Sequence, residues 1–215
     1  MIGFLMFRVA VNTTLQRRCY QNAFPSVPFL ETSCHIDCAF DQHGTNEEKA
    51  CWTRLMKCKV RSLRDSPYDI TVAVDTDVWP DATSDVSKFV PAVTYIANRH
   101  DFSATVDTWS DGDYVTSTAF NGGFVIIRRS PAILTFLNNV LAFLDKHPGS
   151  HEQFAYQQLL INSNNTAVPW GFLHHTWSCR NPAIKHCKFV HSHAVTGCPY
   201  CRKKRHWQES ACLDQ

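Results

Sequence analysis

Residues 66–77 read Ser-Pro-Tyr-Asp-Ile-Thr-Val-Ala-Val-Asp-Thr-Asp, a β-branched run that ends in two aspartates. Its three β-branched apolar residues favour a strand, and its proline lies before the run. Side chains two residues apart on a strand point to the same face, so we expect Asp75 and Asp77 to project side by side. The alternative is a strand that runs into a solvated acidic turn over residues 75–85.

Two adjacent carboxylates repel each other unless a cation lies between them. A hard divalent ion that prefers oxygen ligands, Mg2+ or Mn2+, is the natural occupant and would keep open coordination positions for a diphosphate. Open α/β sheets bind ligands beyond the carboxyl ends of their strands, where this pair is expected. The pattern therefore predicts a cation site at Asp75 and Asp77.

Composition describes an ordinary folded protein, with 215 residues, 44% hydrophobic and 19% charged. This length favours a single domain over residues 1–215, in which residues 196–215 form a cysteine-containing basic tail. The net charge of +2 favours no nucleic-acid partner. The basic run 202–205 is interpreted as a solvated tail, with a diphosphate contact as the alternative. No stretch approaches the roughly 18 apolar residues of a membrane span.

Ten cysteines are many for a cytosolic enzyme, yet too few per residue for a disulfide scaffold. Glycosylation sequons begin at Asn12 and Asn164, and they matter only in a secretory lumen. These features leave the compartment open between the cytoplasm and a Golgi or secretory lumen.

The last forty residues allow a structural Zn2+ site, because a C-x2-C pair is half of a common ligand pattern. Free or disulfide-paired cysteines are the alternative. The candidate ligands are Cys179, Cys187, Cys198, Cys201, His206 and Cys212. The earlier pair Cys34 and Cys38 fits a surface turn, a disulfide or a ligand group.

Apolar periodicity predicts strands that alternate with helices, which is typical of a layered α/β domain. Strands are expected at 1–11, 27–40, 69–75, 103–108 and 120–129, and helices at 45–63, 84–99 with an interruption at Pro91, 131–147 and 150–160. Capping patterns support three of these helix starts, at Thr45 with Glu48, Ser130 with Pro131, and Ser150 with Gln153. Residues 12–45 show no good amphipathic helix.

Five short blocks, in this order, resemble the nucleotide-diphospho-sugar transferases of the GT-A fold. They are residues 59–63 before 66–69, then Asp75-Thr76-Asp77, then residues 120–128, then Glu152-Gln153, and a final Val190-His191-Ser192-His193. The resemblance spans about residues 55–195. It implies a GT-A (Rossmann-like) α/β fold with a central mixed sheet flanked by helices.

The resemblance also implies a donor and metal site. Asp77 would bind Mn2+ or Mg2+ directly, while Asp75 would contact the ribose, the metal or both, with Thr76 between them. His191 or His193 would be the third protein ligand, and we prefer His191. Lys59 would place a positive charge near the donor phosphates, with a solvated helix lysine as the alternative.

The same resemblance places Asn121, Gly122 and Gly123 at the donor sugar, in a tight turn where the backbone approaches closely. A plain turn or a bulge is the alternative. The asparagine amide would hydrogen-bond to sugar hydroxyls.

Glu152 is a candidate acceptor-binding group or general base, and Gln153 a donor-side contact or a helix cap. Relatives often carry Asp-Gln at this point, so Glu152 departs from the pattern. Asp107, Asp111 and Asp113 compete for the role of base, which stays unassigned, and we take Glu152 and Asp113 as the catalytic candidates.

Together these features predict a metal-dependent glycosyltransferase that moves a sugar from a UDP- or GDP-sugar to a hydroxyl of a glycan, protein or small-molecule acceptor. A nucleotide-sugar hydrolase is one alternative, and a catalytically silent, zinc-stabilised binding domain is another. Because residues 12–45 lack a clear helix, a shortened, unusual or incomplete nucleotide pocket is also expected.

Overall fold

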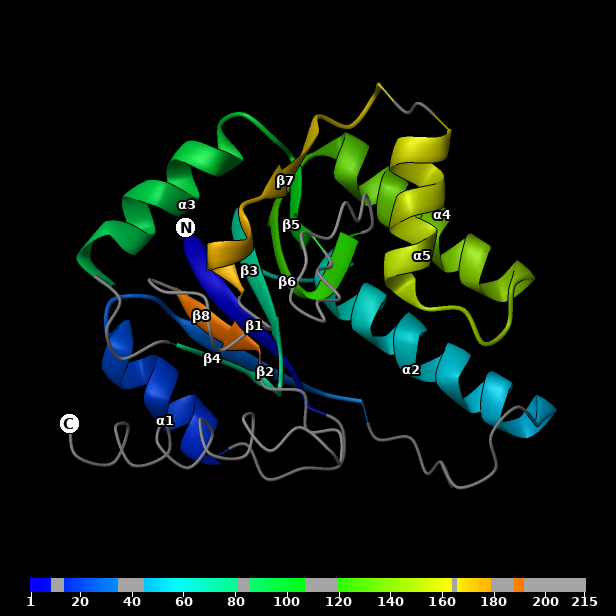
Figure 1. Cartoon of the computed structure of the whole chain (residues 1–215), viewed down its shortest axis with the longest axis horizontal. Helices are drawn as coiled ribbons and strands as arrows, with labels where there is room; N and C mark the ends of the chain where they lie inside the picture. Colours follow the sequence, from blue (N-terminus) through cyan, green and yellow to red (C-terminus); the bar gives the residue numbers. More distant parts are fainter. Residues whose placement is uncertain are drawn as a thin grey trace, which may run out of the picture.

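The fold is built around a six-stranded sheet (Figure 1). The computed structural model describes residues 1–8, 14–34, 45–80, 86–106, 120–163, 166–178 and 188–191. In spatial order the sheet contains β2 (Phe29–Ser33), β1 (Ile2–Arg8), β3 (Ile70–Asp75), β6 (Phe120–Arg128), β5 (Phe102–Val106) and β7 (Trp170–Leu173). β1 pairs in parallel with β2 and β3, and β5 with β7, whereas β6 is antiparallel to both its neighbours. The predicted mixed sheet is confirmed.

Helices cover both faces of this sheet (Figure 1). One face carries α2 (Asn46–Arg64), α4 (Pro131–Lys146) and α5 (Glu152–Tyr156), which continues as the π-helical segment η2 (Gln157–Asn162). The other face carries α1 (Thr14–Ala23), α3 (Phe89–Ala97) and a two-stranded sheet of β4 (Val78–Pro80) and β8 (Phe189–His191). Two short 3-10 turns, η1 (Val86–Lys88) and η3 (His175–Trp177), precede α3 and follow β7.

Side chains that alternate along the central strands pack into two hydrophobic cores, one on each face of the sheet. In β1, Leu5 and Phe7 pack toward α2 and α4, whereas Phe4 and Met6 pack toward α1 and α3. This is the two-residue period of a strand buried on both faces. The second core is rich in aromatic rings, with Phe4 at its centre. Both layers are therefore specified by the central strands.

The caps at α2 and α4 are confirmed. The Thr45 hydroxyl accepts a hydrogen bond from the Glu48 amide at 3.1 Å, and the Ser130 hydroxyl accepts one from Ile133 at 3.2 Å. The cap expected at Ser150 is wrong by one residue. His151 precedes α5 and makes no side-chain cap there.

The helix α1 was missed by the prediction for residues 12–45. Gln16, Cys19 and Tyr20 are buried and share one face with Ala23, at the spacing i, i+3, i+4 and i+7. A buried polar residue, Gln16, interrupts the apolar pattern, and the prolines that argued against a helix lie after its end. The first strand–helix–strand unit is therefore present.

Pro91 also behaves differently from the prediction. It lies in the first turn of α3, where a proline is tolerated because its missing N–H would have no helical partner. The helix begins at Phe89 rather than being interrupted.

Candidate active site

The carboxyl end of β3 carries the acidic pair, but only Asp75 belongs to the strand. Thr76 and Asp77 form the turn into β4. The expectation that both carboxylates project from one strand face is therefore wrong. The strand ends at Asp75, so the alternation of side chains along a strand does not extend to Asp77. Asp75 and Asp77 are both half-buried, at and just beyond the carboxyl end of β3.

Two side chains of α1 hold this turn. Gln16 Nε2 donates to the carbonyl oxygen of Val78 at 2.7 Å and to that of Asp75 at 3.4 Å. The Tyr20 hydroxyl donates to the same Val78 oxygen at 3.1 Å. Burial, with Asp77 and Asp75 nearby, raises the pKa of Tyr20 well above its usual range. Its phenol therefore stays protonated and keeps donating to the turn.

Lys59 links the acidic turn to α5. Its Nζ lies 2.6 Å from Asp75 Oδ1 and 2.7 Å from Glu152 Oε1. Only 7% of Lys59 is exposed, so the interpretation of a solvated helix lysine is wrong. The consecutive elements α2 and β3 thus meet the distant α5 in one buried charge cluster.

The pKa values of this cluster follow from burial and charge. Burial alone would lower the pKa of Lys59, but the Asp75 and Glu152 carboxylates reverse this and raise it. Burial would raise the pKa of Glu152, yet its ion pair with Lys59 brings it below its ordinary value. The pKa of Asp75 is raised by burial and by the neighbouring Asp77 and Glu152 carboxylates, although Lys59 opposes this. Of the two carboxylates paired with Lys59, Asp75 alone therefore keeps a pKa above its ordinary value.

The Asn-Gly-Gly segment lies in a bulge of β6 rather than in a tight turn. The β5–β6 register pairs Ala104 with Val125 but Thr105 with Asn121, so β6 carries extra residues at this point. This irregularity fits a bulge, the alternative to a turn, and the contact of the segment with the donor sugar stays a prediction. A Cβ added at Gly122 would lie 2.3 Å from Glu152 Oε1. Glycine is required there because the Glu152 carboxylate occupies that space.

Hydrogen bonds join the bulge to α5. The Gly122 amide donates to Gln153 Oε1 at 3.2 Å, and the Gly123 amide donates to Asn121 Oδ1 at 2.7 Å. Gln153 therefore supports the bulge in this structure. Asn121 is buried, with 2% of its surface exposed.

Sequence reasoning missed three residues of this region, Gln16, Tyr20 and Tyr156. The first two were detectable from their shared helical spacing with Cys19. Tyr156 follows Glu152 by one turn of α5, and its hydroxyl is buried without a hydrogen-bond partner among the described residues. Burial, together with Glu152 and Asp75, raises its pKa well above the usual range. No local pattern distinguishes it from a core tyrosine.

A metal ion would draw its ligands from the Asp75–Asp77 turn and β8. The β4–β8 pair places the backbone of His191 opposite Val78, the residue after Asp77. Two carboxylates and an imidazole are the kinds of ligand that a divalent ion accepts. The described side chains alone contain no group of three such ligands, and the His191 side chain is not among them.

Several predicted residues lie outside the described parts of the chain. They are Asp107, Asp111, Asp113, His193, Cys38, the zinc candidates from Cys179 to Cys212, both sequon asparagines and the basic tail. The predictions made for them stay predictions.

A surface cavity of about 250 Å³ lies between α2 and the segment that precedes α5. It is lined by Glu48, Lys49, Trp52, Gly149 and His151. The rings of Trp52 and His151 meet edge to face, with centroids 4.6 Å apart. Trp52 precedes Lys59 by two turns of α2, and His151 precedes Glu152 directly. The cavity therefore lies roughly 10 Å along α2 from the cluster.

A sequence profile for nucleotide-diphospho-sugar transferases matches residues 6–209. The chain belongs to this family. It is accordingly a glycosyltransferase, as the sequence predicted. A search among curated proteins gave no match.

Solved structures similar to this transferase share its fold at low identity. One is a glycosyltransferase involved in the glycosylation of the major capsid of PBCV-1, with a TM-score of 0.58 and 14% identity over 100% of this chain and 99% of that one. The galactosyltransferase LgtC, in complex with donor and acceptor sugar analogues, has a TM-score of 0.58 and 10% identity over 100% and 94%. Mouse xyloside xylosyltransferase 1 has a TM-score of 0.52 and 9% identity over 92% and 99%. The predicted GT-A fold is confirmed.

Within the described residues of this transferase, no helix combines the length and the apolar character needed to cross a membrane.

Proposed function

We propose that this transferase moves a sugar from a UDP- or GDP-sugar to a hydroxyl acceptor in a reaction that depends on Mn2+ or Mg2+. The observation that carries the proposal is the buried contact of Lys59 with Asp75 and Glu152, next to a turn that α1 holds in place. The cluster lies at the carboxyl end of the central strand β3, where open α/β sheets bind their ligands.

Asp75 and Asp77 form the metal side of the proposed site, with His191 as the preferred third ligand. A divalent ion bound there would neutralise the negative charge of the departing nucleoside diphosphate. The raised pKa of Asp75 supports this role, because crowded carboxylates gain most from a nearby cation. Gln16 and Tyr20 would keep the turn in position while the donor binds.

Lys59 would both position the carboxylates and contact the donor. An ammonium group has three N–H donors, and two of them are directed at Asp75 and Glu152. We assign the third to the donor diphosphate or sugar. The raised pKa keeps Lys59 charged throughout the physiological range.

Glu152 is better suited to holding the sugar than to acting as the general base. An effective base has a pKa near the operating pH, whereas the pKa of Glu152 is lowered by Lys59. The carboxylate is also fixed between Lys59 and Gly122, and this fits an acceptor of hydrogen bonds from sugar hydroxyls. The base is then sought among Asp107, Asp111 and Asp113, of which Asp113 is our catalytic candidate.

The cavity at Trp52 and His151 is the place we propose for the acceptor. Indole and imidazole rings offer an apolar surface on which a sugar ring can pack, and Glu48 and Lys49 offer hydrogen-bonding groups of opposite charge. This mixed lining favours a neutral glycoside over an anionic acceptor.

Calorimetric titration with a panel of UDP- and GDP-sugars, in Mn2+ and in EDTA, tests the proposal. We expect one donor to bind with Mn2+ and to lose most of its affinity in EDTA. Binding of no donor by folded protein would overturn the proposal. Release of free sugar at the same rate with and without acceptor would instead favour the hydrolase.

A further inference from the structure

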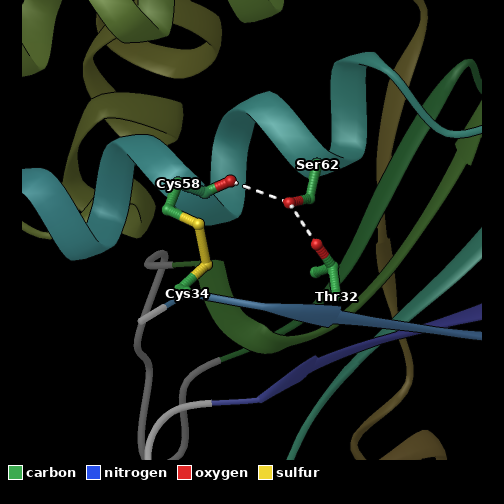
Figure 2. Close-up of a disulfide and its surroundings, with 4 residues drawn as sticks. All are labelled: Thr32, Cys34, Cys58 and Ser62. Atoms are coloured by element: carbon green, nitrogen blue, oxygen red, sulfur yellow. Dashed lines mark hydrogen bonds between the residues drawn. A yellow bond between two sulfur atoms is a disulfide. The ribbon is translucent and has the colours of Figure 1, made fainter. Parts of the chain in front are cut away.

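A disulfide fastens α2 to the edge of the sheet. It joins Cys34, which directly follows β2, to Cys58 in α2, with the Cα atoms 5.9 Å apart (Figure 2). β2 is an edge strand whose partner in the sheet is β1. Cys34 is buried in the core beneath α2, so the bond links helix and strand from within.

A hydrogen-bond relay lies one turn further along the same helix. Ser62 donates to the carbonyl oxygen of Cys58 at 2.9 Å, and the Thr32 hydroxyl of β2 lies 3.1 Å from the Ser62 hydroxyl (Figure 2). Because the Ser62 proton is directed at Cys58, Thr32 acts as the donor to Ser62. β2 thus holds this turn of α2 both by a covalent bond and through hydrogen bonds.

The residue after Cys58 is Lys59, the centre of the charge cluster. Consecutive side chains on an α-helix diverge by about 100° around the axis. Cys58 reaches β2, whereas Lys59 reaches Asp75 at the end of β3 and Glu152 in α5. One turn of α2 is therefore fixed on one side by the disulfide and on the other by two ion pairs.

We propose that the Cys34–Cys58 disulfide is a positioning device for Lys59, so that full transferase activity requires the oxidised protein. This inference rests on the proposed function, because it takes the Lys59 cluster as part of the active site. The two ion pairs, at 2.6–2.7 Å, are also charge-assisted hydrogen bonds, whose strength falls steeply when the distance or angle changes. A small rotation or shift of α2 would separate Lys59 from Asp75, Glu152 or both.

The other described cysteines agree with an oxidised active form. Cys19 and Cys51 are also disulfide-bonded, so all four cysteines within the described residues are oxidised. Disulfides persist in secretory and extracellular compartments and are reduced in the cytosol. The inference therefore favours a Golgi or secretory lumen over the cytoplasm.

The test compares the full-length oxidised protein with the double variant Cys34→Ala/Cys58→Ala, which leaves the disulfides of Cys19 and Cys51 intact. Val93→Ala is the matched control, because it removes buried volume from α3 on the opposite face of the sheet. A brief pulse of acetic anhydride, followed by peptide mass spectrometry, measures the acetylation rate of Lys59 relative to the exposed Lys146. The kcat/KM for the donor is measured on the same samples.

We expect Lys59 acetylation to rise about tenfold in the double variant and kcat/KM to fall about tenfold, while Val93→Ala changes neither ratio by more than about twofold. Unchanged Lys59 acetylation in the double variant would overturn the inference. Equal increases in the double variant and Val93→Ala would also overturn it, because they would indicate general loosening. The acetylation result stands even if no donor is turned over, so failure of the proposed function is distinguishable.

Discussion

Gly122 of β6 packs directly against the carboxylate of Glu152 in α5. Any side chain at position 122 would overlap with that carboxylate. The hypothetical Cβ would lie 2.3 Å from Oε1, closer than real Cβ atoms approach other groups. Glu152 in turn anchors Lys59. The glycine is thus coupled through Glu152 to the acidic turn at Asp75.

Gly122→Ala is expected to reduce kcat/KM about 100-fold, because a displaced Glu152 pulls Lys59 away from Asp75. The overpacked site should also lower the free energy of unfolding by about 2 kcal/mol. Steady-state kinetics and urea unfolding measure the two effects. Gly171→Ala is the matched control, since its Cβ would meet only the end of the half-exposed His100 side chain, which can move aside. Equal activity losses in the two variants would contradict this account.

Asp77→Asn should abolish the Mn2+-dependent part of donor binding and leave the free energy of unfolding within about 0.5 kcal/mol of wild type. The reason is that Asp77 lies in the turn after β3, outside both hydrophobic cores. Calorimetric titration in Mn2+ and in EDTA gives the answer directly. Donor affinity that still depends on Mn2+ in this variant would place the metal elsewhere.

The third ligand is tested in the same assay with His191→Ala and His193→Ala. We expect a large loss for the first variant and a small one for the second, because β8 brings the backbone of His191 beside the acidic turn. The reverse order would assign the ligand to His193.

The Glu152–Lys59 pair predicts how stability depends on pH. Because the pKa of Glu152 is lowered in the folded state, its contribution is present above the unfolded-state pKa and disappears as the pH falls through the folded-state value. Glu152→Gln should cost about 2 kcal/mol near pH 7, less than a fully isolated buried charge because Asp75 still pairs with Lys59. In acid, below the folded-state pKa of Glu152, the two proteins should converge. Urea unfolding at both pH values measures the difference, and a gap that widens on acidification would refute the pairing.

Trp52→Ala should raise the acceptor KM about tenfold, which corresponds to about 1.4 kcal/mol, while donor affinity stays unchanged. The expected loss comes from the apolar ring surface in the cavity next to His151. Initial rates at varied acceptor, with donor held constant, separate the two effects. Tyr95→Ala serves as the control, because it removes an exposed aromatic side chain from α3 on the other face of the sheet. An unchanged acceptor KM would exclude Trp52 from the acceptor site.

The sequence by itself determined the local elements and the family. Its β-branched run specified β3, and its caps at Thr45 and Ser130 marked the starts of α2 and α4, because propensity and capping act within a few residues. Alternating strands and helices then limited the fold to a layered α/β arrangement. These signals failed at α1, where a buried glutamine that serves the Asp75 turn breaks the apolar pattern.

Only the tertiary structure decided how the site is assembled. Lys59 is buried between Asp75 and Glu152, Gly122 packs against Glu152, and Cys34 is bonded to Cys58. Each of these contacts joins residues of different elements. Such contacts depend on the register of the sheet and on the packing of α2 and α5 against it, and no short pattern encodes them. A lysine such as Lys59 is expected to be solvated when its helix is considered alone. It becomes buried and ion-paired only when the helix packs on the sheet, because burial and pairing are properties of the packed elements.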